Sequence, residues 1–499
     1  MSALKKLYLI SIISFTLSCQ NKKINENRST LVSSPLVSDT QQNTENLISN
    51  NTESATPLRA PAYATFVQDN TNKHIKMFNE IMDSKNDSER LNKFKKLLDR
   101  QIDTYYFISH KLKKFDTILG ESYQKKQAGE KISSSDKEQL KKLHIENVAL
   151  WEFKEKNLDE LLKLYNILLV NVHDENSKYQ RESKWIIAKI PFWMRASWNK
   201  DGDQLPIIEI SEKLHQVNLD FKRKSSKVNS NYFPELNTFL KLTAEQYLDA
   251  VKKTDDNYNT RYLTDSKTNE NIFKSWESYQ SKLEDLNVFK TLTDEKSQIS
   301  GNHFNTGLWS ISFAGGPDLN STAQIYEVLK SSSTPATFFW TGQNLQKYGS
   351  LAKNQKDSNI TKAISSYSQM SFTEMDTAQI NKEINRSVDD FTKMTGEKPT
   401  FFRCPYANCG DDDSEAQKNI QHRKMQIVSW NVDAFDWHDR NPDLIFERTK
   451  KQIEIFESGI VSFQETNNQT PIVSKRIIQF LKSKYKIEPL QKLIEEAKN

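Results

Sequence analysis

Hydrophobic residues recur at two different periods along this chain, and the change between the periods falls near residue 300. From about Lys73 to Asn287 the period is helical, most clearly from Ser135 to about Val170, where leucines and aromatic residues return at three- and four-residue steps. Ser135 with Glu138 has the spacing of a helix-capping box. The expected fold of this region is an antiparallel helical bundle or a helical array.

After about Ser300, short β-branched and aromatic runs alternate with helical segments. This alternation predicts parallel strands joined by helices, with the functional face at the C-terminal ends of the strands. The predicted fold class is therefore α/β for the C-terminal part, preceded by an all-α domain. The predicted strands are Leu308–Phe313, Ala336–Trp340, Phe401–Arg403, Ile427–Val432 and Ile460–Phe463.

The N-terminal residues have the pattern of an export signal. Lys5 and Lys6 precede an apolar segment from Leu7 to Leu17, which is typical of a secretory signal peptide. Cys19 follows directly and resembles the lipobox cysteine of bacterial lipoproteins, which is lipidated and becomes the mature N-terminus. The alternative is an ordinary signal peptide with an incidental cysteine. The next stretch, to about residue 71, is rich in Asn, Ser, Thr and Gln, as a flexible tether would be.

These patterns divide the chain into a lipoprotein signal peptide at 1–18, a disordered tether at 19–72, a helical domain at 73–298 and a barrel at 299–490. We expect an exported protein that is lipid-anchored in the cell envelope, with the outer membrane or the periplasmic side favoured. The net charge is only +5 over 499 residues, and the lysines are interleaved with acidic residues. Without a basic stripe, the charge pattern argues against a nucleic-acid partner.

Cys404 and Cys409 lie five residues apart in one predicted loop. An oxidising compartment would permit a disulfide between them. A metal site is not favoured, because two thiolates alone fall short of the four ligands that zinc normally takes. The alternative is a pair of free thiols in a partly buried loop.

Several ordered motifs resemble the polysaccharide deacetylase family, also called the NodB homology family. Residues 312–317 read Ser-Phe-Ala-Gly-Gly-Pro, where the family has Thr-Phe-Asp-Asp-Gly-Pro. Residues 402–406 read Phe-Arg-Cys-Pro-Tyr, which is similar to the family's Phe-Arg-Pro-Pro-Tyr, and residues 436–437 resemble its Asp-Trp motif. The resemblance covers roughly residues 305–490 and implies a distorted (β/α) barrel with fewer strands than the eight-fold form.

The resemblance also implies a chemistry, whose groups this chain lacks. In the family, one Asp and two His hold a divalent metal, the metal-bound water attacks, an Asp acts as base and a His protonates the leaving amine. A general acid or base contributes ~10²–10⁴ in rate, so the loss of all five groups predicts that family-type catalysis is absent, and no cofactor is expected. The matching positions hold Ala314 for the base, Gly315 for the metal Asp, Ser365 and Gln369 for the two His, and Gln464 for the acid His.

Four other family positions keep residues that could bind a sugar. They are Arg403, Tyr406, Asp436 and Trp437, which in the family orient the base and line the sugar groove. An Arg–Asp pair beside aromatic rings can hold a glycan by hydrogen bonds and stacking. The alternative interpretation is that Arg403 and Asp436 form a structural ion pair and Trp437 packs the barrel.

The leading functional hypothesis is non-catalytic: binding of an envelope glycan such as peptidoglycan, or scaffolding of an envelope partner, with the helical domain contacting protein. A second hypothesis is an atypical metal-dependent carbohydrate N- or O-deacetylase that uses relocated groups, for which the candidates are Asp318, Asp433, Asp436 and Glu465. A third makes the barrel a folded platform, with the helical region acting through a protein partner.

Overall fold

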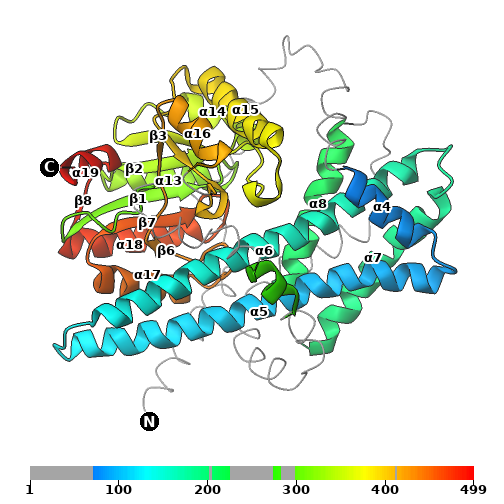
Figure 1. The fold of residues 1–499 in the computed structure, drawn as a ribbon, viewed down its shortest axis with the longest axis horizontal. Helices are drawn as coiled ribbons and strands as arrows, with labels where there is room; N and C mark the ends of the chain where they lie inside the picture. Colours follow the sequence, from blue (N-terminus) through cyan, green and yellow to red (C-terminus); the bar gives the residue numbers. More distant parts are fainter. Residues whose placement is uncertain (1–70, 202–204, 225–273, 282–297, 411–412, 499) are drawn as a thin grey trace, which may run out of the picture. The chain divides into compact units, whose positions relative to one another are not determined.

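A computed structural model describes residues 71–201, 205–224, 274–281, 298–410 and 413–498 (Figure 1). The predicted signal peptide, the predicted lipidation site Cys19 and nearly all of the predicted tether lie outside these residues. In the described part, none of the helices combines the length and the apolar character needed to cross a membrane.

The expected helical region is confirmed for residues 73–201, 205–224 and 274–281, and the rest of the predicted range lies outside the described residues. Its two longest helices, α5 and α6, run side by side and are joined by a short turn (Figure 1). Residues 274–281 are also helical. The helices are α4 (Thr71–Met82), α5 (Asp87–Gln127), α6 (Ser134–His173), α7 (Gln180–Asp201) and α8 (Leu205–Lys224).

The start of α6 differs from the predicted capping box. Ser133 is the N-cap, and its hydroxyl accepts a hydrogen bond of 3.0 Å from the backbone N–H of Asp136. The sequence has three consecutive serines here, and each could cap a helix. The capping prediction at Ser135 with Glu138 is therefore wrong by two residues, whereas the predicted helix itself is present.

The C-terminal region contains a parallel half-barrel sheet, which confirms the predicted α/β class. The strand order is β5-β4-β3-β2-β1-β7-β6, with β8 paired to β1, and every ladder is parallel. The strands are β1 (Leu308–Ala314), β2 (Ala336–Trp340), β3 (Ile360–Ser365), β4 (Phe401–Arg403), β5 (Gln426–Ile427), β6 (Val432–Asp433), β7 (Gly459–Gln464) and β8 (Lys486–Ile487).

Helices connect most of these strands, as the alternating sequence pattern predicts (Figure 1). They are α13 (Ser321–Ser331), α14 (Gly342–Asn354), α15 (Thr377–Thr395), α16 (Glu415–His422), α17 (Pro442–Phe456), α18 (Thr470–Lys484) and α19 (Leu490–Glu496). Two short 3-10 turns, η1 (Phe372–Glu374) and η2 (Pro405–Ala407), lie in the loops that follow β3 and β4.

One predicted strand is wrong. The run from Ile427 to Val432 is two short strands, because β5 ends at Ile427 and β6 begins at Val432. Between them, Asn431 turns its side chain to the backbone: its amide nitrogen donates to the carbonyl of Ser458 at 3.0 Å, and its amide oxygen accepts from the N–H of Ile460 at 2.9 Å. These bonds fix a bend that the apolar composition of the run does not reveal.

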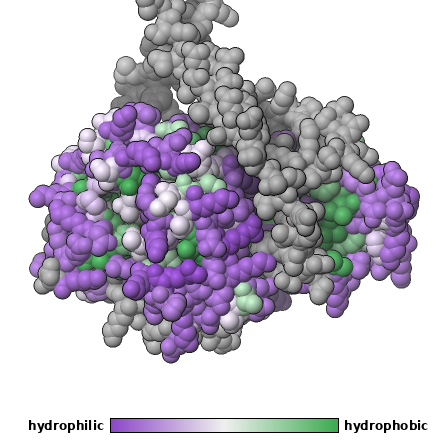
Figure 2. Space-filling model, turned by 90° about the horizontal axis from the view of Figure 1, so that it is seen from above, coloured by the Kyte–Doolittle hydropathy of each residue, from purple (hydrophilic) through white to green (hydrophobic). Residues whose placement is uncertain are grey.

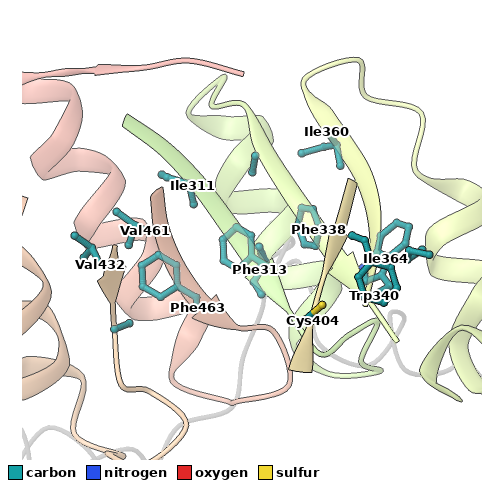
Figure 3. Packing of buried hydrophobic residues seen from close by; sticks show 14 of the residues in the cluster. Ile311, Phe313, Phe338, Trp340, Ile360, Ile364, Cys404, Val432, Val461 and Phe463 are labelled. Carbon is teal, nitrogen blue, oxygen red and sulfur yellow. The ribbon is translucent and has the colours of Figure 1, made fainter. Parts of the chain in front are cut away.

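Side chains alternate between the two faces of the sheet. On the face covered by helices, Ile311 and Phe313 of β1 pack with Phe338 of β2 and with Val461 and Phe463 of β7 (Figure 3). The opposite face points into the half-barrel. Because the period of a strand is two residues, the small and polar positions of β1 and β7 face this interior.

The interior of the half-barrel shares one hydrophobic cluster with the helical region. The cluster joins Phe115 of α5 and Trp151 of α6 to Ala314 and Phe339 of the sheet. The described residues from Thr71 onward accordingly belong to one compact unit. The boundary between a helical domain and a barrel at 298–299 stays a prediction.

On the face shown in Figure 2, hydrophilic residues cover most of the described surface, and apolar residues gather only in small patches. This surface agrees with the interleaved lysine and acidic positions of the helices. The apolar residues of the described chain therefore serve mainly to pack the interior of the protein.

Candidate functional site

Four of the five positions that lack the family's chemical groups lie at or directly after the C-terminal ends of β1, β3 and β7. Ala314 ends β1 and Gln464 ends β7, and the two are register partners. Ser365 ends β3, and Gly315 follows β1 directly. The motif alignment made from the sequence therefore places its residues at one end of the sheet, where family chemistry would occur.

The turn after β1 is shaped for glycine. Gly315 has a φ of +85°, and a β-carbon there would lie 3.1 Å from Oε1 of Gln464. A β-carbon on Gly316 would lie 2.1 Å from the carboxyl carbon of Glu465. An aspartate at position 315 would need a left-handed backbone that L-residues rarely adopt. The turn therefore disfavours the aspartate that the family resemblance predicts at position 315.

The two positions expected to hold imidazoles carry uncharged groups with other uses. Ser365 donates from Oγ to the carbonyl of Arg403 at 2.8 Å. Gln369 has a φ of +63°, and its N–H donates to Oγ of Ser366 at 3.0 Å. The side-chain oxygen Oε1 of Gln369 is buried and has no hydrogen-bond partner in the described residues.

The site does not fit a zinc ion. Zinc in proteins takes thiolate, imidazole and carboxylate ligands, whereas the three predicted metal positions offer a glycine, a hydroxyl and an amide. In the parts of the chain that the structure describes, no group of three or more His, Cys, Asp or Glu residues is placed to hold a metal ion.

Arg403 lies inside the half-barrel and is 1% exposed. Its guanidinium donates to Oγ of Ser312 and Oγ of Ser462, each at 3.0 Å, and to the carbonyls of residues 428–429 at 3.2 and 3.1 Å. Burial lowers the pKa of Arg403 to about 9, although the charge of Asp433 acts in the opposite direction. Arg403 therefore ties β4 to β1 and β7 across the interior.

The predicted pairing of Arg403 with Asp436 is wrong: within the described residues, these two side chains form no ion pair with each other. Both carboxylate oxygens of Asp436 accept from the N–H of Gln464 at 3.1 Å, and Oδ2 also accepts from the hydroxyl of Thr470 at 2.6 Å. Burial raises the pKa of Asp436 to about 7, against the effect of these bonds. Asp436 thus holds the end of β7 to the start of α18.

The other candidates for relocated chemistry also have structural partners. Asp318 accepts from the N–H groups of residues 320–321 at the start of α13. Asp433 accepts from the indole N–H of Trp430 at 2.8 Å. Glu465 accepts from the hydroxyl of Thr322 and from the indole of Trp340, and burial raises its pKa to about 8.

The aromatic residues expected to line a sugar groove are covered by α6. We call the surface formed by Tyr406, Trp437 and the C-terminal ends of β1, β3, β4 and β7 the mouth of the half-barrel. The indole of Trp151 stacks on that of Trp437 with centroids 5.0 Å apart and planes 7° apart, and it meets the ring of Tyr406 edge-on at 5.0 Å. Tyr406 and Trp437 are 6% and 7% exposed. Their role in glycan binding stays a prediction.

Cys404 and Cys409 form a disulfide, with Cα atoms 5.4 Å apart. The bridge closes the loop that contains η2, and this loop carries Tyr406 in a left-handed conformation with a φ of +53°. It therefore constrains the backbone of one side of the mouth.

Sequence reasoning missed the contribution of α5 and α6 to this site. Trp151 recurs at helical spacing with its neighbouring leucines, and such a position predicts core packing. Trp151 is indeed buried, but the aromatic rings that it contacts, those of Trp437 and Tyr406, belong to the mouth. The sequence carries no clear signal of this contact, because Glu152, which the structure buries beside Trp151, is one of several acidic residues along the helix.

The C-terminal region is similar to known polysaccharide deacetylases. Residues 301–425 match the family model described as polysaccharide deacetylase. A peptidoglycan-N-acetylmuramic acid deacetylase, PdaC of Bacillus subtilis, is 33% identical over 144 residues, which are 29% of this chain and 29% of the relative. A peptidoglycan-N-acetylglucosamine deacetylase of Bacillus cereus is 27% identical over 142 residues, or 28% of this chain and 50% of the relative. The chain thus spans half or less of the length of these relatives.

Among solved structures, a CE4 family pseudoenzyme from Bacillus anthracis is similar at 23% identity with a TM-score of 0.36. The match covers 39% of this chain and 68% of that structure.

Proposed function

Since the C-terminal region carries a polysaccharide deacetylase domain, we propose that this protein uses the domain without deacetylation, as a cell-envelope lipoprotein that binds a glycan such as peptidoglycan. The lipid anchor at Cys19 and the envelope location belong to the proposal. In the alternative version of the proposal, the protein binds no glycan, and its helical region scaffolds a partner in the envelope.

The observation that supports the proposal most is the chemistry of the five family positions. Ala314 and Gly315 have no ionisable group, Ser365 is bonded to the backbone, and Gln369 and Gln464 are amides. Without a general acid, a general base or metal-activated water, little rate enhancement beyond binding is expected.

The choice of glycan rests on relatives and on two aromatic residues. The curated relatives named above are peptidoglycan deacetylases. Tyr406 and Trp437 remain at the mouth, and flat aromatic faces are suited to stacking against sugar rings.

A deacetylase that uses relocated groups is the competing function. Its candidate catalytic residues are Asp436 and Glu465, because burial raises the pKa values of both carboxyl groups and raised pKa values are typical of catalytic acids. Both carboxyls are buried and hydrogen-bonded within the protein, so a substrate would first have to displace these contacts.

Co-sedimentation with purified peptidoglycan sacculi tests the proposal. The full-length protein is expected to pellet with sacculi without releasing acetate from them. Trp437→Ala is expected to weaken the association roughly fivefold to tenfold, since a stacked aromatic contributes about 1 kcal/mol beyond its buried area. Trp309→Ala, at a fully buried position on the helix-facing side of β1, is the matched control.

Two results would contradict the proposal. Unchanged co-sedimentation of Trp437→Ala would remove the mouth from glycan binding. Metal-dependent acetate release that is lost in Asp436→Asn or Glu465→Gln would instead support the competing deacetylase function.

A further inference from the structure

Helix α6 occupies the place at which the proposed glycan would stack. Trp151 is 6% exposed and lies against both Trp437 and Tyr406. The separation of 5.0 Å and the angle of 7° between the two indoles leave no room for a sugar ring between them. A glycan and Trp151 would therefore compete for the same face of Trp437.

The next residue of α6 makes polar contacts with the loop that follows β3, beside the mouth. The carboxyl group of Glu152 accepts from the hydroxyls of Ser371 and Thr373, the latter at 3.1 Å, in the loop after β3. Burial raises the pKa of this carboxyl group, against the effect of the hydroxyls. Together Trp151 and Glu152 present an apolar stacking face and a hydrogen-bonding group, and a substituted sugar also offers an apolar C–H face and hydrogen-bonding groups.

Polar contacts outside the mouth anchor the helix pair. On α5, Oγ of Ser109 lies 2.7 Å from Nε2 of His438. Asp116 accepts two hydrogen bonds of 2.6 Å from Arg448 of α17. These contacts hold α5 against the half-barrel without involving Tyr406 or Trp437, and α6 packs along α5.

Two polar atoms, one in the mouth and one in the loop after β3, have no partner in the closed arrangement. The indole nitrogen of Trp437 and Oε1 of Gln369 are buried and have no hydrogen-bond partner within the described chain. A buried polar group without a partner costs about 1–3 kcal/mol. Sugar hydroxyl and acetamido groups could bond to both atoms, whereas Trp151 cannot accept from the first or donate to the second from a stacked position.

We propose that α6 covers the mouth and can be displaced from it. In the closed state Trp151 and Glu152 block the glycan site, and a glycan strand that binds Trp437 and Tyr406 displaces them. The inference rests on the proposed function and adds the regulation of the same site. The ring of Trp151 fits the aromatic face of the mouth, whereas the indole nitrogen of Trp437 and Oε1 of Gln369 stay available to a ligand.

Binding of fluorescently labelled, soluble glycan strands prepared from peptidoglycan provides the first test. Full-length Trp151→Ala is expected to bind these strands at least tenfold more tightly than the wild type, because the competing ring is removed. Trp185→Ala is the matched control: this tryptophan of α7 packs in the helical cluster away from the mouth, and its loss should leave the dissociation constant unchanged.

The outcomes separate the inference from the function on which it rests. Equal affinity of the wild type and Trp151→Ala would overturn the inference and leave glycan binding intact. A lack of binding by every variant would overturn the proposed function, and the inference with it.

Hydrogen exchange of the wild-type protein avoids any folding defect of a variant. Saturating glycan strands are expected to increase amide exchange in residues 147–155 of α6 and to reduce it in residues 404–410. If the strands protect residues 404–410 while exchange in α6 stays unchanged, the helix is not displaced and the inference is wrong.

Discussion

Replacing Arg448 by alanine is expected to lower the free energy of unfolding by about 3–5 kcal/mol, because removal of one member of a buried ionic group leaves its partners uncompensated. The Arg448 side chain is 2% exposed and binds Asp116 of α5 and Asp439. Burial alone would lower the pKa of Arg448, but the two carboxylates raise it well above its usual value. The same burial raises the pKa of Asp439.

Urea unfolding followed by circular dichroism at neutral pH measures this effect. Arg476→Ala is the matched control, since Arg476 pairs with Asp443 at the surface, where the two side chains are 33% and 84% exposed. An exposed pair contributes about 0–1 kcal/mol. A similar small loss for both variants would show that the link between α5 and α17 is not a buried ionic contact.

Glu465→Gln is expected to stabilise the protein at alkaline pH, by roughly 2–4 kcal/mol at pH 8. The pKa of Glu465 rises from 4.5 to about 8 on folding, because the carboxyl is buried against Thr322 and Trp340. Below the unfolded pKa both states hold the proton. Between the two pKa values only the unfolded state releases it, so the wild type loses stability as pH rises through this range, and glutamine removes that loss.

Thermal or urea unfolding at several values from pH 5 to pH 8 tests the sign. The difference between Glu465→Gln and the wild type should grow with pH. Glu397→Gln, at a side chain that is 53% exposed, should give the same difference at every pH. If the stabilisation by Glu465→Gln does not increase with pH, Glu465 is ionised in the folded protein.

Much of the sheet could be predicted from residue type alone. Strands β2 and β4 have the predicted bounds, because their aromatic and apolar runs are buried on both faces, as parallel strands usually are. Strand β3 was not predicted. Its Thr361 and Lys362 dilute the apolar pattern, and the structure pairs Lys362 with Glu397.

Side-chain partners at the site could be predicted less well. The motifs placed Ala314 and Gln464 correctly at the strand ends, because motif spacing follows strand order. The partners of Arg403 depend on which strands meet across the interior, and those are Ser312 and Ser462. Neither serine carries a signal in the linear sequence.

The cover of the mouth by α6 was beyond sequence reasoning for a different reason. Trp151 has the periodicity of a core residue, and it is one. The periodicity identifies the buried face of a helix but does not specify its partner. Contact with Trp437, nearly 300 positions later in the chain, is a property of the tertiary fold.

Zinc binding tests most directly the proposal that this polysaccharide deacetylase-like domain functions without a catalytic metal. Calorimetric titration of zinc into full-length, chelator-stripped protein requires no knowledge of the glycan. We predict no detectable binding at micromolar zinc, because Gly315, Ser365 and Gln369 replace the three ligands. Tight binding of one zinc ion per chain would contradict the account and would show that other side chains have taken over the metal site.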